Sequence, residues 1–191
     1  MTSATASARV PPSLLGMTLF VSSEVMFFGA LFASYFLLRG TTQPWPPEGG
    51  VETTLPLPVS LTLCLLASSA TVHAGVAALE RGDRDAAARW LGVTIGLGAV
   101  FLGGQAYEYS ELAREDVAAS SDVFSTLFFT ITGFHGLHVA IGLAMLATVR
   151  LRRGRYGEGP AEAVAYYWHF VDAVWVVILS LVYLQIPWRF F

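Results

Sequence analysis

The chain has 191 residues, of which 54% are hydrophobic and only 13% are charged, and its mean hydropathy is +0.58. A soluble domain carries about 25% charged residues, so this composition indicates an integral membrane protein. The formal net charge of −3 is too small to predict nucleic acid or another strongly charged partner. Cys64 is the only cysteine, which excludes an intrachain disulfide and a thiolate cluster.

Five stretches are long and apolar enough to cross a bilayer as helices, and short polar connections separate them. In chain order they are predicted at 14–38, 57–79, 88–109, 123–149 and 164–187. Residues 1–13 lack the basic region and short apolar core of a signal peptide, so the first stretch is expected to be retained as a span. The sequence therefore predicts an all-α, polytopic membrane protein with one domain, residues 14–188, built as a five-transmembrane-helix bundle.

The chain contains arginine but no lysine, and the distribution of its arginines predicts the orientation of the chain in the membrane. Eight arginines fall in the N-terminal tail and in the second and fourth connections, whereas three fall on the opposite side. Basic residues gather on the cytoplasmic side of membrane proteins. The tail is therefore expected in the cytoplasm and the C-terminus outside, in a multi-pass protein of the cell (inner or plasma) membrane.

Small residues spaced four apart predict where helices approach closely, because small side chains let helix backbones meet in lipid. This pattern is found in the first three predicted spans. Its members are Gly29 and Ala33, then Ala67, Thr71 and Gly75, then Gly92, Gly96 and Gly104.

Polar side chains within the predicted spans are few and include all four histidines. They are Glu24, His73, Gln105, Glu108, His135, His138, His169 and Asp172. A charge at the bilayer centre costs roughly 2.5–3.5 kcal/mol on insertion scales, so these groups should face protein, water or a partner. With a rise of about 1.5 Å per residue, Glu24 lies near mid-membrane and several of the others reach the same level, whereas Glu108 lies close to the outer surface.

Two interpretations of the histidines remain open. His135 and His138 share a helix face, as do His169 and Asp172, so each pair could ligate a metal or haem. Alternatively, imidazoles and carboxylates satisfy one another in a buried polar network. His135 and His138 lie on the same side of one helix, which suits two ligands to one metal but not the two faces of one haem, and the network is favoured.

The remaining polar groups predict no catalysis by themselves. Glu24 is typical of a proton-relay or packing group, and for Gln105 with Glu108 a helix-end pair at the interface is an equally good interpretation. No hydrolase, phosphate-loop or zinc-protease motif occurs in the sequence. Two classes remain, a non-catalytic subunit of a membrane complex or a small proton- or ion-coupled carrier. Carriers are expected to show inverted halves or broken helices, and five spans with prolines only in loops or at span ends disfavour them.

Four stretches, in four different spans and in the same order, resemble subunit III of the haem–copper respiratory oxidases, the cytochrome c oxidase family. They are GMTLFVSSEVMFFGALFASYF (16–36), GGQAYEY (103–109), STLFFTITGFHGLHVAIG (125–142) and YWHFVDAVWVVILSLVYL (167–184). By this resemblance Glu24 is similar to the family's intramembrane glutamate. Three pairs match the family's motifs as well: Gln105 with Glu108, His135 with His138, and His169 with Asp172.

The resemblance implies a subunit of a proton-pumping oxidase that reduces O2 to water in the respiratory chain. This chain is then expected to carry no cofactor, because the haems and copper of the family belong to subunits I and II. It is expected to pack directly against subunit I, within a complex or supercomplex that includes subunit II. Its implied roles are assembly, stability during turnover and sustained proton uptake.

The resemblance also implies a bound structural phospholipid, which the family holds in a cleft between two helix groups. This chain resembles the shorter form of the family and lacks the first helix group, so a partner subunit would have to supply one wall of that cleft. The accessory subunit of nitric oxide reductases shares the fold and is the alternative. The fuller SEVMFF and YWHFVD matches favour the oxidase.

Overall fold

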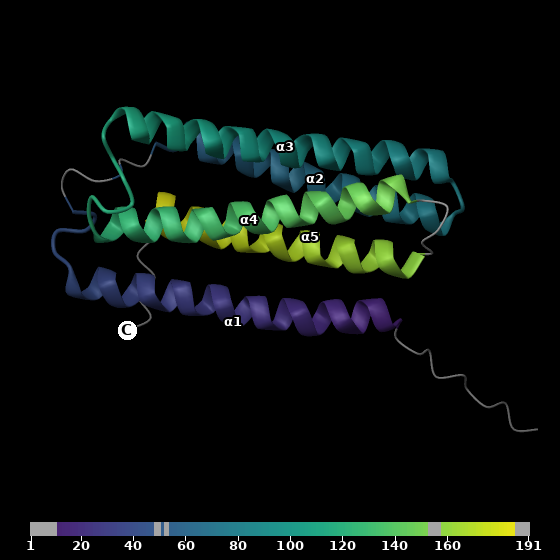
Figure 1. The fold of residues 1–191 in the computed structure, drawn as a ribbon, viewed down its shortest axis with the longest axis horizontal. Coiled ribbons are helices and arrows are strands. Elements are labelled where there is room, and N and C mark those ends of the chain that lie inside the picture. Colours follow the sequence, from purple (N-terminus) through teal and green to yellow (C-terminus); the bar gives the residue numbers. More distant parts are fainter. Residues whose placement is uncertain (1–10, 48–50, 52–53, 153–157, 186–191) are drawn as a thin grey trace, which may run out of the picture.

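The computed structural model of the protein describes residues 11–47, 51, 54–152 and 158–185. Within these ranges the chain forms a bundle of long helices that lie side by side and contains no strand (Figure 1). The elements are α1 (Pro12–Thr41), α2 (Pro56–Glu80), α3 (Arg84–Arg114), α4 (Val123–Leu151) and α5 (Glu158–Ile178), continued by a π-helical turn, η1 (Leu179–Tyr183). Five of the described helices are long and apolar enough to cross a membrane, which confirms the predicted all-α membrane fold.

The helices extend past the apolar stretches that predicted them, because polar residues at the membrane surface continue and cap them. α3 begins at Arg84, four residues before the predicted 88, and Asp83 caps it by accepting a hydrogen bond from the Ala86 backbone nitrogen at 2.8 Å. Asp122 caps α4 in the same way, 2.9 Å from the Ser125 nitrogen. The predicted tail, apart from its last residues, and the end of the fifth predicted span lie outside the described residues.

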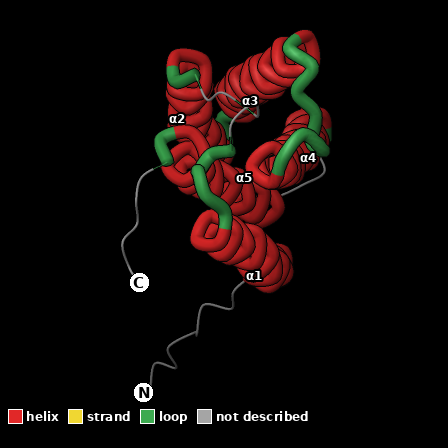
Figure 2. The backbone as a smooth tube through the Cα atoms, turned by 90° about the vertical axis from the view of Figure 1, so that its left-hand side faces the viewer, coloured by secondary structure: helices red, strands yellow, loops and turns green. Residues whose placement is uncertain are grey.

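Figure 2 shows the bundle end-on, with α5 in the middle, α2 and α4 on opposite sides of it, and α1 below. α5 packs against α1, α2 and α4, whereas α3 pairs most extensively with α2. We compared the buried fraction of an apolar 18-residue stretch in each helix. In the fifth helix 56% of these residues are buried, whereas in α1 only 11% are buried. α1 is therefore the helix that the rest of this chain covers least.

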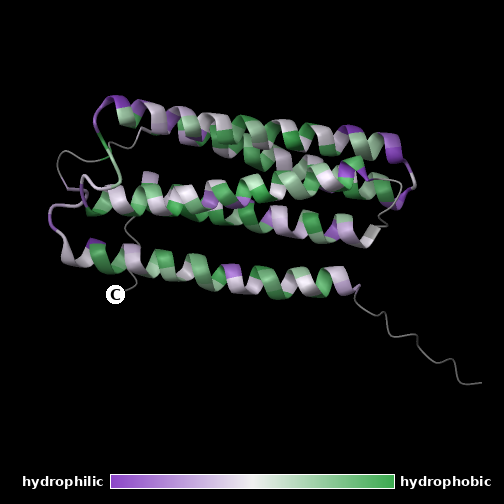
Figure 3. Cartoon of the chain, viewed as in Figure 1, coloured by the Kyte–Doolittle hydropathy of each residue, from purple (hydrophilic) through white to green (hydrophobic). Residues whose placement is uncertain are grey.

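Hydrophobic residues predominate in the middle of each helix, and hydrophilic residues are more frequent at the helix ends (Figure 3). The apolar residues of α1 surround the helix on all sides rather than form a stripe along one face. This is typical of a helix that contacts lipid or another subunit where the bundle does not cover it.

Trp168 of α5 holds the centre of the bundle together. Its indole lies between two glycines of neighbouring helices: a Cβ on Gly98 of α3 would stand 2.8 Å from Trp168 Cη2, and one on Gly142 of α4 would stand 2.8 Å from Trp168 Cε3. The indole Nε1 donates to Ser68 Oγ of α2 at 2.8 Å. One buried side chain of α5 thus packs against three helices at once.

The predicted small-residue contacts are only partly correct. A Cβ on Gly104 would stand 2.5 Å from Leu61 Cδ2, and one on Gly75 would stand 3.1 Å from Leu91 Cδ2, so α2 and α3 do meet closely there. Gly96 and Gly29, in contrast, have no neighbouring atom within 4 Å of an added Cβ, and the prediction is wrong for them. On helices that are apolar on all sides, spacing alone does not distinguish the packed face from the open one.

We predict that Gly98→Ala destabilises the bundle while Gly96→Ala does not. The added methyl at Gly98 would overlap the Trp168 ring, and such overpacking costs about 1–3 kcal/mol. The same methyl at Gly96 meets open space and should stabilise the helix by about 0.5–1 kcal/mol. SDS titration of the detergent-solubilised protein, followed by circular dichroism, measures both. Equal stability of the two variants would contradict the placement of Trp168.

Candidate functional site

The buried carboxylate of α1 has a partner on α4. Glu24 Oε2 lies 2.9 Å from His138 Nε2, and the two side chains are 18% and 9% exposed. His138 Nδ1 lies 2.7 Å from the Phe134 carbonyl oxygen, which only accepts, so Nδ1 carries a hydrogen. The remaining proton then sits between Nε2 and the carboxylate, and the pair is neutral as a whole with that proton on either atom. A neutral pair avoids the free-energy cost of placing a charged carboxylate within the membrane.

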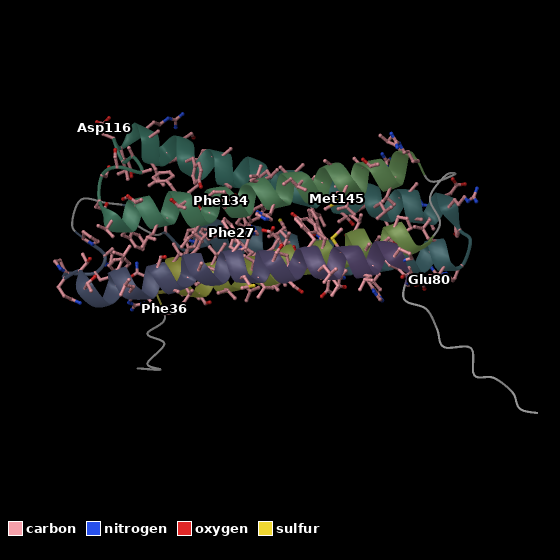
Figure 4. The ribbon with its side chains drawn as sticks, turned by 60° about the horizontal axis from the view of Figure 1, so that its bottom comes forward. Phe27, Phe36, Glu80, Asp116, Phe134 and Met145 are labelled. Atoms are coloured by element: carbon pink, nitrogen blue, oxygen red, sulfur yellow. The ribbon has the colours of Figure 1, made fainter. Side chains whose placement is uncertain are left out.

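Aromatic rings enclose this pair. Phe27 and Phe134 approach each other between α1 and α4, with ring centroids 5.0 Å apart (Figure 4). Phe28 meets the His138 ring edge-on at 5.1 Å, and the Tyr167 hydroxyl donates to the His138 carbonyl oxygen at 3.1 Å. The rings cover part of the pair, and their low polarity strengthens the electrostatic contact between the two groups.

His135, only three residues before His138, faces a different part of the bundle. It is fully buried, stacked on Trp175 at 5.0 Å and edge-on to Phe101 at 5.5 Å. Neither of its ring nitrogens has a hydrogen-bond partner in the described part of the chain. His135 therefore contacts α3 and α5, whereas His138 contacts α1, although the sequence predicted that both lie on one helix face.

Ser69, which was not predicted as a site residue, connects His169 with Asp172. The Ser69 hydroxyl of α2 donates to Asp172 Oδ2 and lies 2.9 Å from His169 Nδ1. A hydroxyl has one hydrogen, so Ser69 accepts from His169 Nδ1–H. Asp172 Oδ1 is buried without a partner among the described residues. His73 follows Ser69 by one turn, on the same helix face and exposed.

The Gln105 and Glu108 side chains belong to two separate contacts. Gln105 is buried and donates from Nε2 to the Thr132 carbonyl oxygen at 2.7 Å. Glu108 accepts from the Tyr183 hydroxyl at 2.7 Å, so it meets η1 rather than α4. Tyr109, which the sequence reading passed over, shares a 2.6 Å hydrogen bond with the Thr132 hydroxyl.

The structure thus distributes the predicted polar residues over several separate contacts instead of one network. Glu24 joins His138, Asp172 joins His169 through Ser69, and Glu108 joins Tyr183. Among the described residues no three His, Cys, Asp or Glu side chains gather as ligands of a metal would. The contacts link helices to one another and form no set of nucleophile, base and oxyanion donors.

The fold and these contacts define a polytopic helical membrane protein whose intramembrane acids and histidines connect its helices. The sequence profile of the family described as cytochrome c oxidase subunit III matches residues 8–188. Relatives named cytochrome c oxidase subunit 3 agree. The chain is 43% identical to that of Thermostichus vulcanus over 177 residues, which cover 90% of this chain and 86% of the relative. It is 42% identical to a probable cytochrome c oxidase subunit 3 of Nocardia farcinica over 175 residues, which cover 88% and 86%.

The chain therefore belongs to the cytochrome c oxidase subunit III family. This confirms the resemblance inferred from the four motifs. It also makes the chain part of an oxidase complex, in a respiratory chain and in a membrane.

Proposed function

We propose that this chain, as subunit III of a proton-pumping haem–copper oxidase, supports the assembly, stability and proton uptake of the catalytic subunit and performs no redox step itself. The relatives named above are oxidase subunits, which favours the oxidase over a nitric oxide reductase complex or a carrier. The haems and copper are then expected in subunits I and II. In this chain, His138 is engaged by Glu24 and His135 by aromatic rings.

The observation that carries this proposal is the contact between Glu24 and His138. α1 is poorly covered by the other helices, and this pair joins its middle to α4. Because the pair holds one proton between two groups, that proton can shift between Glu24 and His138 without changing the net charge of the pair. Both properties suit a subunit that keeps the complex intact during turnover, and neither suits a redox ligand.

Subunit I is the proposed direct partner, with subunit II and the other subunits of a respiratory complex or supercomplex nearby. Membrane lipids surround the rest of the bundle. We propose that one acyl chain of a structural phospholipid lies in an apolar groove of about 380 Å³ between α4 and α5, lined by Ile141, Met145 and Val164 among others (Figure 4 labels Met145). An acyl chain suits such a lining, because it offers no hydrogen-bonding groups.

We also propose that the N-terminus is cytoplasmic and the C-terminus external, from the arginine distribution. Alkaline phosphatase, which is active only outside the cytoplasm, should be active when fused after Arg39 or after Phe191. A fusion after Arg81, in the second connection, is the matched control and should be inactive. The opposite pattern, or activity that differs between the first two fusions, would contradict this orientation.

We predict that Glu24→Gln leaves the initial rate of oxygen reduction within about twofold of the unmodified complex, whereas Glu24→Ala reduces retention of this chain. Glutamine keeps the size and a hydrogen-bonding oxygen toward His138, so α1 stays in place. Alanine leaves the His138 Nε2 unpaired and removes the link between α1 and α4. The rate is measured in freshly purified complex in which the chain has been verified to be present.

A faster loss of activity during sustained turnover is the expected defect of Glu24→Gln, because the variant has no carboxylate to exchange a proton. A fall of the initial rate by orders of magnitude, with the chain present, would mean that Glu24 takes part in the chemical step. The proposed supporting role would then be wrong.

A further inference from the structure

One polar surface of the bundle includes the contact among Ser69, His169 and Asp172 and is partly exposed in this chain. It consists of Ser69 and His73 on α2 with His169 and Asp172 on α5, and is called the α2–α5 seam below. Both imidazoles are exposed in this chain, whereas Asp172 is 5% exposed. α2 and α4 flank α5 on opposite sides, so the seam lies away from the Glu24–His138 contact (Figure 2).

The α5 residues of the seam lie at mid-membrane depth. Asp172 is about 20 Å from one end of its span, Gly159–Tyr183, and about 17 Å from the other, at 1.5 Å per residue. The hydrocarbon core of a bilayer is about 30 Å thick, so lipid headgroups stay about 15 Å from its centre. Only acyl chains or another protein can reach the seam, and acyl chains leave exposed imidazoles unsatisfied.

The seam has more hydrogen-bond acceptors than donors. The Ser69 hydrogen is used on Asp172 Oδ2, and Asp172 Oδ1 is buried with no partner among the described residues. His169 Nδ1–H points to Ser69, which leaves Nε2 of the neutral ring as an acceptor. A group that completes the seam must therefore donate hydrogen bonds.

Exposed apolar side chains and an apolar groove lie beside the seam and are suited to packing against another helix. Leu66, one turn before Ser69, is 50% exposed, and Val176, one turn after Asp172, is 44% exposed. An apolar groove of about 340 Å³ between α1 and α5 continues this surface, and Ala173, next to Asp172, lines it. Polar and apolar contacts at this spacing along α5 suit a second helix that crosses the membrane beside it.

We infer that the α2–α5 seam and the adjoining α1–α5 groove bind a transmembrane helix of another oxidase subunit, which presents a hydrogen-bond-donating side chain to His169 at mid-membrane. This inference rests on the proposed function, because it requires a companion subunit. A second copy of this chain would bring the same excess of acceptors over donors, and a lipid would bring its polar group to the wrong depth.

Site-specific photo-crosslinking in the intact complex, in its native membrane, tests this inference. A photoreactive phenylalanine analogue replaces Leu66 or Val176, which flank the seam without forming it. The expected product joins this chain to a peptide from a transmembrane helix of another subunit, and that product should be absent once detergent has dissociated the complex. Adducts only with lipid, adducts with a second copy, or no adduct would overturn the inference.

Substitutions of polar residues test whether His169 contributes to binding of the partner helix. His169→Leu should reduce both the crosslink from Leu66 and the retention of this chain by roughly fivefold, the size expected of one interhelical hydrogen bond in a membrane. Thr148→Val is the matched control, since it removes an exposed hydroxyl on α4 that bonds only its own helix, and it should change neither. Unchanged crosslinking in His169→Leu would contradict the role of the seam.

The two proposals fail in different ways. If this chain copurifies with no other oxidase subunit, the proposed function is wrong and the seam has no such partner. If it copurifies and the crosslinks from Leu66 and Val176 reach only lipid, the proposed function stands and the docking face is wrong.

Discussion

Polar groups within a bilayer must find partners in protein, and this requirement positions α1 in the bundle. α1 is little covered by its neighbours, but polar contacts attach it along its length. Glu24 meets His138 of α4 at mid-membrane, and the Tyr35 hydroxyl donates to the Leu181 carbonyl oxygen of η1 at 2.6 Å. Arg39 donates to the Gln185 carbonyl oxygen at 3.2 Å. With no water to compete within the membrane, the contacts of Glu24 and Tyr35 limit the positions that α1 can adopt.

α5 connects these contacts to the rest of the molecule. Trp168 and Trp175 each donate an indole N–H to a hydroxyl of α2, at 2.8 Å, and Tyr167 donates to α4. Because α5 is central, one of its sides closes the core while Asp172 and His169 face the α2–α5 seam. The same helix thus supports both the integrity of the chain and, in our proposal, its attachment to a partner.

Apolar length was enough to predict five spans, and the intramembrane position of Glu24 was enough to predict that it needs a partner. The identity of that partner was not predictable. His135 and His138 are three residues apart, about 60° around a helix, and that rotation sends His138 to α1 and His135 to Trp175. Ser69 was missed because a serine within a helix commonly bonds its own backbone, and only the packing of α2 on α5 brings it to Asp172.

A double-mutant cycle between Glu24 and His138 tests most directly whether their contact holds α1 in the bundle. The free energy of unfolding is measured by SDS titration for Glu24→Leu, His138→Leu and the double variant. We predict a coupling energy of about 0.5–3 kcal/mol, because loss of one partner leaves the other unpaired. The matched cycle with His135→Leu should be additive within about 0.5 kcal/mol, since His135 contacts other helices. Additivity in the first cycle, or equal coupling in both, would contradict the account.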